Sequence, residues 1–254
     1  MWTQLPGGSI YRLPGPPVLQ RGAIFKGGNS LISVAIDGPA GAGKSTIARA
    51  IARDLGYLYV DTGALYRAIG LYALEQQADP QNEGQVLPLL PQLHLSLQFA
   101  NGEQQVWLNG RNVSQEIRKN EVSMAASAVS AIPKVREFLF DLQQNLAKEN
   151  NVVMDGRDIG TVVLPKAQVK IFLTASPEER ARRRYEELQQ RGQSVEYTQL
   201  LEEVRRRDYN DAHRAAAPLR RAEDALLVDT TGNSLEQSIV QLTKIVKERL
   251  QDVL

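Results

Sequence analysis

One stretch of the sequence constrains the fold more than any other. An apolar run from Ser33 to Ile36 leads into a glycine-rich turn, and a helical pattern begins directly after it. Four residues match the spacing G-x-x-x-x-G-K-[ST], namely Gly38, Gly43, Lys44 and Ser45. Glycines let successive backbone N–H groups curl around an anion, and the positive end of the following helix points at the same place. The sequence therefore predicts a strand, a phosphate-binding loop and a helix, with Lys44 beside the outer phosphates and the Ser45 hydroxyl as a Mg²⁺ ligand.

The segments on either side of this loop alternate between strand and helix patterns. Further short apolar runs cover 57–60, 151–154, 169–173 and 225–228, with helical patterns between them. This order is typical of a parallel α/β sheet, in which ligands gather at the carboxyl ends of the strands. Asp61, Thr62 and Arg67 follow one such run, and the cluster Asp155-Gly156-Arg157-Asp158 follows another. We therefore expect both groups to lie near the phosphate-binding loop.

Residues 78–113 interrupt the α/β pattern. The runs 94–99 and 104–108 alternate apolar and polar residues around Asn101-Gly102, which predicts a β-hairpin. A helix is expected over 114–130, and a clean amphipathic helix follows Pro133. The sequence therefore predicts a small accessory lobe inserted into the α/β chain.

Composition narrows the classes of protein that remain. The chain has 254 residues, of which 43% are hydrophobic, so it can bury a sizeable core in one large or two small domains. The net charge of +1 gives no global field for nucleic acid or membrane, and the absence of cysteine excludes disulfides and thiolate metal sites. No apolar run is long enough to cross a bilayer. Residues 1–30 are rich in glycine and proline, which predicts a flexible leader.

Two arginine-rich helical patterns follow the fourth apolar run. Ser176, Pro177 and Glu179 have the spacing of an N-cap with a capping box. The arginines fit either an RNA-binding face or a mobile lid that closes over phosphates, but interleaved glutamates weaken the field that RNA binding needs. Five residues recur at helical spacing on one face, which predicts that the charged ones point inward toward a site: Leu200, Val204, Arg207, Asp211 and Arg214.

Taken together, these motifs resemble the bacterial cytidylate kinases. The resemblance rests on the loop Gly38–Ser45 and on the blocks 61–67, 155–161 and 207–214, with Ser127 and Arg136 upstream of the Asp-Gly-Arg-Asp cluster. It extends from about Ser33 to the C-terminus and includes the hairpin insert. Residues 1–30 lie outside it.

The resemblance implies a P-loop NTPase fold, with a five-stranded parallel sheet flanked by helices. Residues 31–254 would form the kinase domain, with a β-containing monophosphate-binding insert at about 78–130 and a short lid at about 180–198. The reaction would be ATP-dependent phosphoryl transfer to CMP and dCMP, giving CDP or dCDP and ADP. The acceptor phosphate is itself an oxyanion nucleophile, so positioning and charge neutralisation by Mg²⁺, Lys44 and arginines carry the catalysis.

The resemblance also implies roles for individual residues. The ATP phosphates would be held by Gly38, Pro39, Ala40, Gly41, Ala42, Gly43, Lys44, Ser45 and Thr46. The acceptor phosphate would be bound by Arg67, Arg157 and Arg214, next to Thr62, and the ribose by Arg207 and Asp211. Ser127, Arg136 and Asp158 would read cytosine. Lys44, Arg157 and the lid arginines Arg180, Arg183 and Arg184 would neutralise the transferring group.

Two other interpretations of the sequence stay open. One is another small-molecule P-loop kinase, of the uridylate or shikimate type. The other is a non-enzymatic nucleotide-sensing or RNA-binding module that uses the arginine runs. Under the preferred interpretation we expect a cytoplasmic monomer whose partners are the small molecules ATP and CMP or dCMP, without nucleic acid or membrane.

Overall fold

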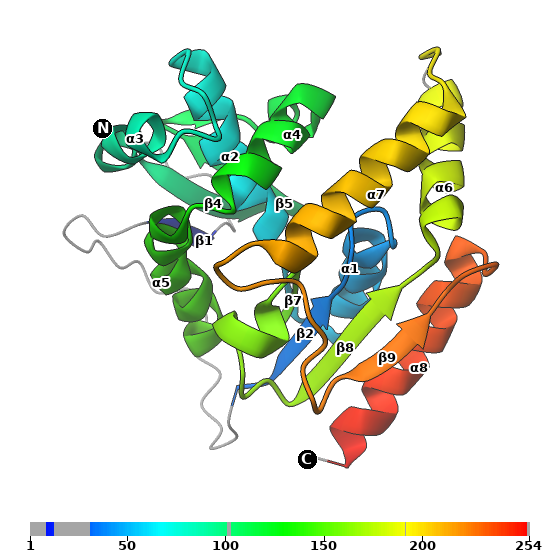
Figure 1. The fold of residues 1–254 in the computed structure, drawn as a ribbon. Coiled ribbons are helices and arrows are strands. Elements are labelled where there is room, and N and C mark those ends of the chain that lie inside the picture. The colour runs from blue at the N-terminus through cyan, green and yellow to red at the C-terminus, as the bar shows by residue number, and fades with distance from the viewer. Residues whose placement is uncertain (1–8, 13–30, 101–102, 191, 253–254) are drawn as a thin grey trace. The chain divides into compact units, whose positions relative to one another are not determined.

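The computed structural model describes residues 9–12, 31–100, 103–190 and 192–252 (Figure 1). The chain divides into two compact units. Met1–Leu31 and Tyr59–Asn151 form one of them, here called the hairpin unit. Ile32–Leu58 and Val152–Leu254 form the other, here called the phosphate-loop unit.

A five-stranded sheet has the strand order β3-β7-β2-β8-β9. Its strands are Leu58–Asp61 (β3), Val152–Gly156 (β7), Ser33–Asp37 (β2), Val169–Thr174 (β8) and Leu226–Asp229 (β9). β2 pairs in parallel with β7 and β8, and β8 pairs in parallel with β9. Every residue of β2 and β7 is buried, as the continuous apolar character of central parallel strands predicts. The α/β class and the parallel sheet predicted from sequence are confirmed.

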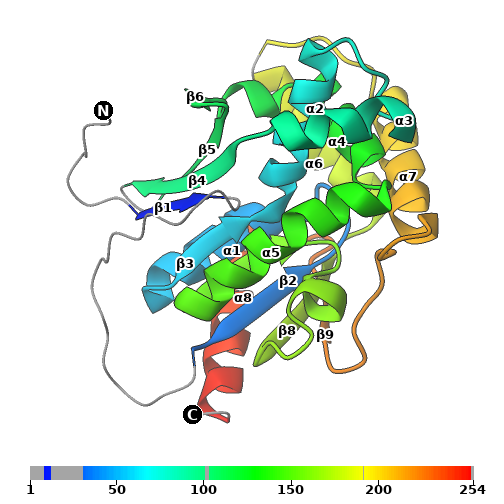
Figure 2. The ribbon, with the colours of Figure 1, turned by 90° about the vertical axis from the view of Figure 1, so that its left-hand side faces the viewer.

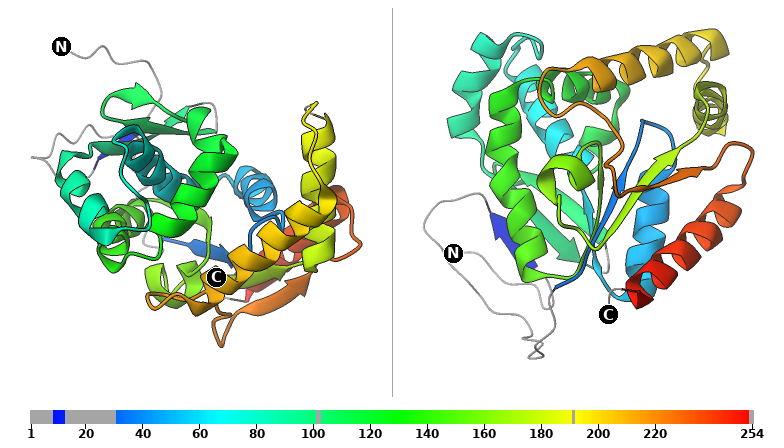
Figure 3. Two further views of the ribbon diagram at one scale, coloured as in Figure 1. Left: turned by 45° about the horizontal axis from the view of Figure 1, so that its top comes forward. Right: turned by 60° about the horizontal axis from the view of Figure 1, so that its bottom comes forward.

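Four long helices belong to the phosphate-loop unit: Lys44–Leu55 (α1), Pro177–Gln190 (α6), Tyr197–His213 (α7) and Leu235–Gln251 (α8). α1 packs beside α8, and α6 packs beside α7 (Figure 3). α1 buries Ile47 and Ile51, whereas α8 buries Leu242 and Val246, so each helix turns its apolar stripe inward. α8 begins with the predicted capping box between Ser234 and Gln237.

The hairpin unit contains an antiparallel sheet of order β1-β4-β5-β6 (Figure 2). Its strands are Ser9–Arg12 (β1), Leu95–Ala100 (β4), Glu103–Leu108 (β5) and Arg111–Asn112 (β6). The antiparallel pairing of β4 with β5 confirms the strands of the predicted hairpin. Its predicted turn, Asn101-Gly102, lies outside the described residues. β1 falls within the predicted flexible leader and pairs with β4, while the rest of residues 1–30 is not described.

The helical elements of the hairpin unit are Thr62–Glu75 (α2), Glu83–Val86 (α3), Leu87–Gln92 (η1), Glu116–Arg118 (η2), Asn120–Val129 (α4) and Pro133–Glu149 (α5). The helix expected over 114–130 is thus a 3₁₀ turn followed by α4. α2 and α4 pack closely at Gly70. A Cβ placed on that glycine would lie 2.8 Å from the backbone nitrogen of Ala126, so the close approach requires glycine.

Candidate active site

The phosphate-binding loop follows β2 and ends where α1 begins. Gly38 has φ +150°, and a Cβ at this position would lie 1.9 Å from the carbonyl oxygen of Leu173. Only glycine can therefore bring the loop so close to the end of β8. Gly43 is the N-cap of α1, with φ 88°, and no side chain caps this helix terminus. The loop therefore ends at free helical N–H groups, which favour an anion.

Lys44 and Ser45 start α1 and make different contacts. The Lys44 side chain is buried, and its Nζ donates a hydrogen bond to the carbonyl of Pro39 at 2.8 Å. Burial, together with the nearby charge of Arg157, lowers the pKa of Lys44 to about 7, against the opposing effect of Asp155 and other carboxylates. The Ser45 hydroxyl donates to Asp155 Oδ2 at 2.8 Å. The loop lysine and the loop serine thus both interact with the end of β7.

The cluster 155–158 lies where β7 ends, as predicted. Arg157 Nε donates to Asp211 Oδ2 at 2.8 Å, and the Arg214 guanidinium lies 3.6 Å from Asp158 Oδ1. Asp158 is buried and directly precedes a single π-helical turn, Ile159–Val163. Single π-helical turns are rare in proteins, and those that occur often lie at functional sites.

Asp37, the last residue of β2, holds that π-helical turn in place. Its two carboxylate oxygens accept hydrogen bonds from the backbone N–H groups of Ile159, at 2.8 Å, and Gly160, at 2.7 Å. Burial raises the pKa of Asp37 to about 6, although these two hydrogen bonds act in the opposite direction. The π-helical turn that follows Asp158 is therefore held by the side chain of Asp37, the residue directly before the phosphate-binding loop.

The charged residues predicted on one face of α7 do point inward. Asp211 is buried among Arg157, Arg207 and Arg214. Burial raises the pKa of Asp211, but these positive charges outweigh burial and keep it below its usual value. The pKa of Arg157 is raised because Asp211 outweighs the effect of burial. One detail of the prediction is wrong: α7 ends at His213, and Arg214 is its C-cap with extended backbone, φ −63° and ψ 142°.

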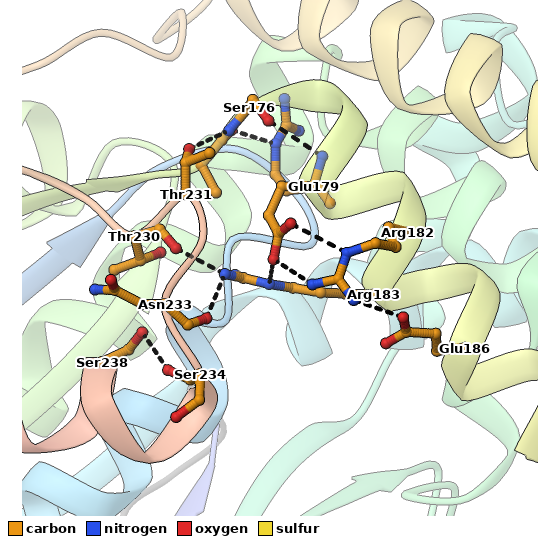
Figure 4. A network of polar contacts seen from close by, with 12 residues as sticks. Ser176, Glu179, Arg182, Arg183, Glu186, Thr230, Thr231, Asn233, Ser234 and Ser238 are labelled. Atoms are coloured by element: carbon orange, nitrogen blue, oxygen red, sulfur yellow. Dashed lines mark hydrogen bonds and ion pairs between the residues drawn. The ribbon is translucent and has the colours of Figure 1, made fainter.

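The predicted lid arginines lie on α6. Arg183 Nε donates to Glu179, and its Nη2 donates to the carbonyl of Thr230 at 2.8 Å (Figure 4). Arg184 forms an ion pair with Glu187 at 3.5 Å, and its side chain is about one third exposed. Arg180 is buried and pairs with Asp208 on α7.

Only half of the predicted capping box of α6 is present. The Ser176 hydroxyl accepts from the Glu179 N–H at 3.1 Å, as expected. Glu179 does not return the bond, because its carboxylate binds Arg182 and Arg183 instead (Figure 4). The Ser176 N–H donates to the hydroxyl of Thr231 at 2.9 Å.

The remaining predicted site residues belong to the hairpin unit. Asp61 caps α2 by accepting from the Ala64 N–H at 3.0 Å, Thr62 is buried, and Arg67 lies 3.8 Å from Asp61. In the same unit, the Arg136 guanidinium on α5 lies over the ring of Tyr66 on α2, at 5.3 Å from the ring centroid. Arg136 Nη1 also donates to the carbonyl of Ser130, whose hydroxyl donates to the carbonyl of Ser127. The unit thus brings Ser127 and Arg136 together.

Sequence reasoning placed Asp155 near the loop as part of the Asp-Gly-Arg-Asp cluster but gave it no role of its own, and it assigned no role to two further acidic residues that contact the site, Asp37 and Asp208. Asp155 carried a signal, since it opens the Asp-Gly-Arg-Asp cluster at the end of a strand. Asp37 ends the strand before the loop, and a buried acidic residue at the end of an apolar run also merits attention. Asp208 carried none, because it lies among alternating charges on α7.

Comparison with known proteins identifies the family of this chain. The family model described as Cytidylate kinase matches residues 34–248. The chain is 51% identical over 223 residues to a cytidylate kinase of Caldicellulosiruptor bescii, covering 86% of this chain and 99% of that one. It is 48% identical over 221 residues to a cytidylate kinase of Carboxydothermus hydrogenoformans, covering 87% and 99%.

The chain belongs to the cytidylate kinase family. It is therefore a nucleoside monophosphate kinase. This family membership favours the prediction of a cytidylate kinase over the two alternatives, another small-molecule P-loop kinase and a non-enzymatic module. A solved shikimate kinase from Bacteroides thetaiotaomicron is also similar, with a TM-score of 0.42 and 16% identity, over 87% of this chain and 98% of that one. Within the described residues, no helix is long and apolar enough to cross a membrane.

Proposed function

We propose that this cytidylate kinase family member transfers the γ-phosphoryl group of ATP to CMP or dCMP, producing ADP and CDP or dCDP. One observation carries the proposal at the level of residues. The Asp-Gly-Arg-Asp cluster connects the phosphate-binding loop to α7: Asp155 accepts a hydrogen bond from Ser45 at 2.8 Å, and Arg157 donates one to Asp211 at 2.8 Å, next to the buried Lys44. Such a network can hold two phosphate groups next to each other without a general base.

On the donor side, residues 38–46 hold the ATP phosphates with their backbone N–H groups and Lys44. Ser45 and Asp155 fit a Mg²⁺ ion, because both offer oxygen and their side chains are already in contact at 2.8 Å. Mg²⁺ commonly takes one or two protein oxygens and completes its shell with water and substrate phosphates. When bound, the ion neutralises charge on the phosphate oxygens. Among the described residues, no group of three or more His, Cys, Asp or Glu side chains could hold a metal ion.

On the acceptor side, Arg157 and Arg214 bind the CMP phosphate together with Arg67, next to Thr62. Arg207 and Asp211 hold the ribose. Ser127, Arg136 and Asp158 read cytosine, whose exocyclic amine suits a carboxylate acceptor. The charges that follow the transferring group come from Lys44 and Arg157 and, from the lid at about 180–198, Arg183 and Arg184. We assign a different role to Arg180 below.

We also propose that residues 78–130 act as the monophosphate-binding insert, residues 31–254 as the kinase domain and residues 1–30 as a leader whose strand β1 pairs with β4 of the insert. The enzyme would act as a cytoplasmic monomer on small-molecule substrates, without nucleic acid.

The experiment compares Asp158→Asn with wild type by kcat/KM for CMP, dCMP, UMP and AMP. The amide keeps the shape of the carboxylate but can turn its NH₂ toward the uracil carbonyl. We expect wild type to prefer CMP and dCMP, and the variant to narrow the CMP-to-UMP ratio by about tenfold, which corresponds to about 1.4 kcal/mol.

Asp54→Asn is the matched control, since Asp54 is half-exposed and pairs with Lys247 on the surface. The ratio should not change in this control. A wild type that prefers UMP or AMP contradicts the proposed acceptor. An unchanged ratio in Asp158→Asn contradicts the assignment of Asp158 to the base and leaves it as the partner of Arg214.

A further inference from the structure

Arg180 is a buried cation with an unusual set of partners. Its side chain is only 3% exposed. Nε donates to the carbonyl of Ala175 at 2.9 Å, and Nη1 donates to the carbonyl of Ala40 at 3.0 Å. Both guanidinium Nη atoms also donate to the carboxylate of Asp208, with Nη1 at 2.9 Å. Four of the five N–H donors of this side chain are therefore used within the protein.

The partners of Arg180 come from three separate segments. Ala40 is in the middle of the phosphate-binding loop, Ala175 follows β8, and Asp208 lies on α7. The aliphatic stem of Arg180 also packs against the loop, since a Cβ placed on Gly41 would lie 3.4 Å from Arg180 Cβ. One side chain thus connects the loop to α7 by both packing and hydrogen bonds.

α7 is the helix that carries Arg207 and Asp211 next to Asp208. Any shift of Asp208 relative to the phosphate-binding loop moves these neighbouring residues as well, because they share one helical turn. In-line phosphoryl transfer requires that the two reacting phosphates keep a fixed distance and direction, and a misplacement of about 1 Å costs about a hundredfold in rate.

We propose that Arg180 is a positioning residue that ties the phosphate-binding loop to α7, so that donor and acceptor groups keep the spacing that transfer requires. This inference rests on the nucleotide-binding roles proposed above for the loop and for α7. In this inference Arg180 links the loop to α7 and does not contact the transferring phosphoryl group; contact with that group is the role that the family resemblance implied for it. Only the planar fork of arginine can bind a carboxylate with two atoms while also reaching two carbonyls, so lysine should not replace it.

The test uses four variants: Arg180→Met, Arg180→Lys, Asp208→Asn and the double variant Arg180→Met/Asp208→Asn. Arg182→Met is the matched control, because Arg182 lies on the same helix but is exposed and pairs with Glu179 and Glu186. The readouts are kcat and KM for both substrates, the affinity for ADP at equilibrium, and the melting temperature. All kinetics are measured well below the lowest melting temperature.

We expect Arg180→Met, Arg180→Lys and Asp208→Asn each to lower kcat by about tenfold or more, with KM values and ADP affinity within about threefold of wild type. The double variant should be no worse than the more impaired single variant, because both remove the same link. The control should match wild type. A fold defect lowers the melting temperature and the fraction of active enzyme, which also lowers the apparent kcat, so kcat is calculated per ADP-binding site counted at equilibrium; a loss of kcat that persists per binding site supports the positioning role.

Three results would overturn the inference. Asp208→Asn with normal kcat, beside an impaired Arg180→Met, would mean that Arg180 acts directly on the phosphoryl group. Full activity of Arg180→Lys would mean that charge alone suffices. Additive losses in the double variant would mean that the two residues act separately. If Arg180→Met does not fold, Asp208→Asn still decides, since Asp208 is 28% exposed. A wild type that does not phosphorylate CMP would contradict the proposed function instead, and these tests then use the acceptor that it does phosphorylate.

Discussion

The two units of this chain bury different kinds of side chain. Among the described residues, the phosphate-loop unit buries six charged residues: Asp37, Lys44, Asp155, Asp158, Arg180 and Asp211. The hairpin unit buries no charged residue among those described, and its buried polar residues are the neutral Thr62, Ser130 and Gln143. Of the site residues proposed in the hairpin unit, Thr62 is buried, whereas Arg67, Ser127 and Arg136 are each partly exposed.

This difference shows how the two units are stabilised. Buried charges are costly unless they are paired and hydrogen-bonded. In the phosphate-loop unit several of these pairings join segments distant in sequence, such as Arg157 with Asp211 and Arg180 with Asp208. The charges are therefore held in place before a nucleotide arrives, which favours phosphate chemistry. The hairpin unit depends instead on close apolar packing, such as that of α2 against α4. Changes to the buried charges of the phosphate-loop unit should affect catalysis or acceptor recognition. Changes in the hairpin unit should affect stability or acceptor recognition and leave the binding of the donor nucleotide unchanged.

The largest expected effect is that of Lys44→Met on turnover. Removing the buried cation should lower kcat by about a hundredfold or more, because a charge that follows the transferring group is lost. Lys247→Met is the matched control, since Lys247 belongs to the same unit, is half-exposed and should be silent. Steady-state kinetics at saturating ATP and CMP measures both. Near-normal turnover of Lys44→Met would refute the assignment of the loop.

Gly70→Ala should affect stability in the hairpin unit. The added methyl group would meet backbone atoms of Ala125 and Ala126 at 3.0 Å and 2.8 Å, and such overpacking costs about 1–3 kcal/mol. Gly84→Ala is the control in the same unit, because its nearest neighbour is the side-chain oxygen of Asn82 at 3.3 Å, which can move. Thermal unfolding measures the difference. An unchanged melting temperature of Gly70→Ala would mean that the two helices separate easily.

The smallest expected effect is a pH dependence of stability that originates at Lys44. Its pKa is about 7 in the folded state and 10.5 in an unperturbed lysine, so between these values the unfolded chain binds a proton that the folded chain lacks. Stability should therefore rise with pH across this window, and the charge of Lys44 opposes folding below pH 7. The free energy of unfolding of Lys44→Met minus that of wild type should therefore be larger at pH 6.5 than at pH 8.5, by about 1 kcal/mol or more. If the two proteins differed in free energy of unfolding by the same amount at both pH values, the burial of a charged lysine would be contradicted.

Local patterns predicted most of the elements because the information lies within each segment. The apolar runs gave the strands of the parallel sheet, and the alternation at 94–99 and 104–108 gave β4 and β5. The G-x-x-x-x-G-K-[ST] spacing placed Lys44 and Ser45 at the start of α1. The resemblance to a family added roles that residue patterns alone do not carry.

Partners distant in sequence could not be predicted in the same way. Ser45 binds Asp155 because β2 and β7 are neighbours in the sheet, and single-sequence reasoning does not give that strand order. Asp37 binds the π-helical turn for the same reason. Glu179 was expected to complete a capping box, but Arg182 and Arg183 compete for its carboxylate. Likewise, the sequence did not reveal that Arg180 is enclosed by Ala40, Ala175 and Asp208.

The division of roles between the two units is tested most directly by equilibrium binding of ADP and of CMP to Arg136→Met. Arg136 lies in the hairpin unit, over Tyr66, and is proposed to read cytosine. Lys134→Met is the control, since Lys134 lies on the same helix and is 62% exposed. We predict that Arg136→Met binds CMP about tenfold more weakly or worse, while its affinity for ADP is unchanged. Loss of ADP affinity in parallel with CMP affinity, or unchanged CMP affinity, would contradict this account.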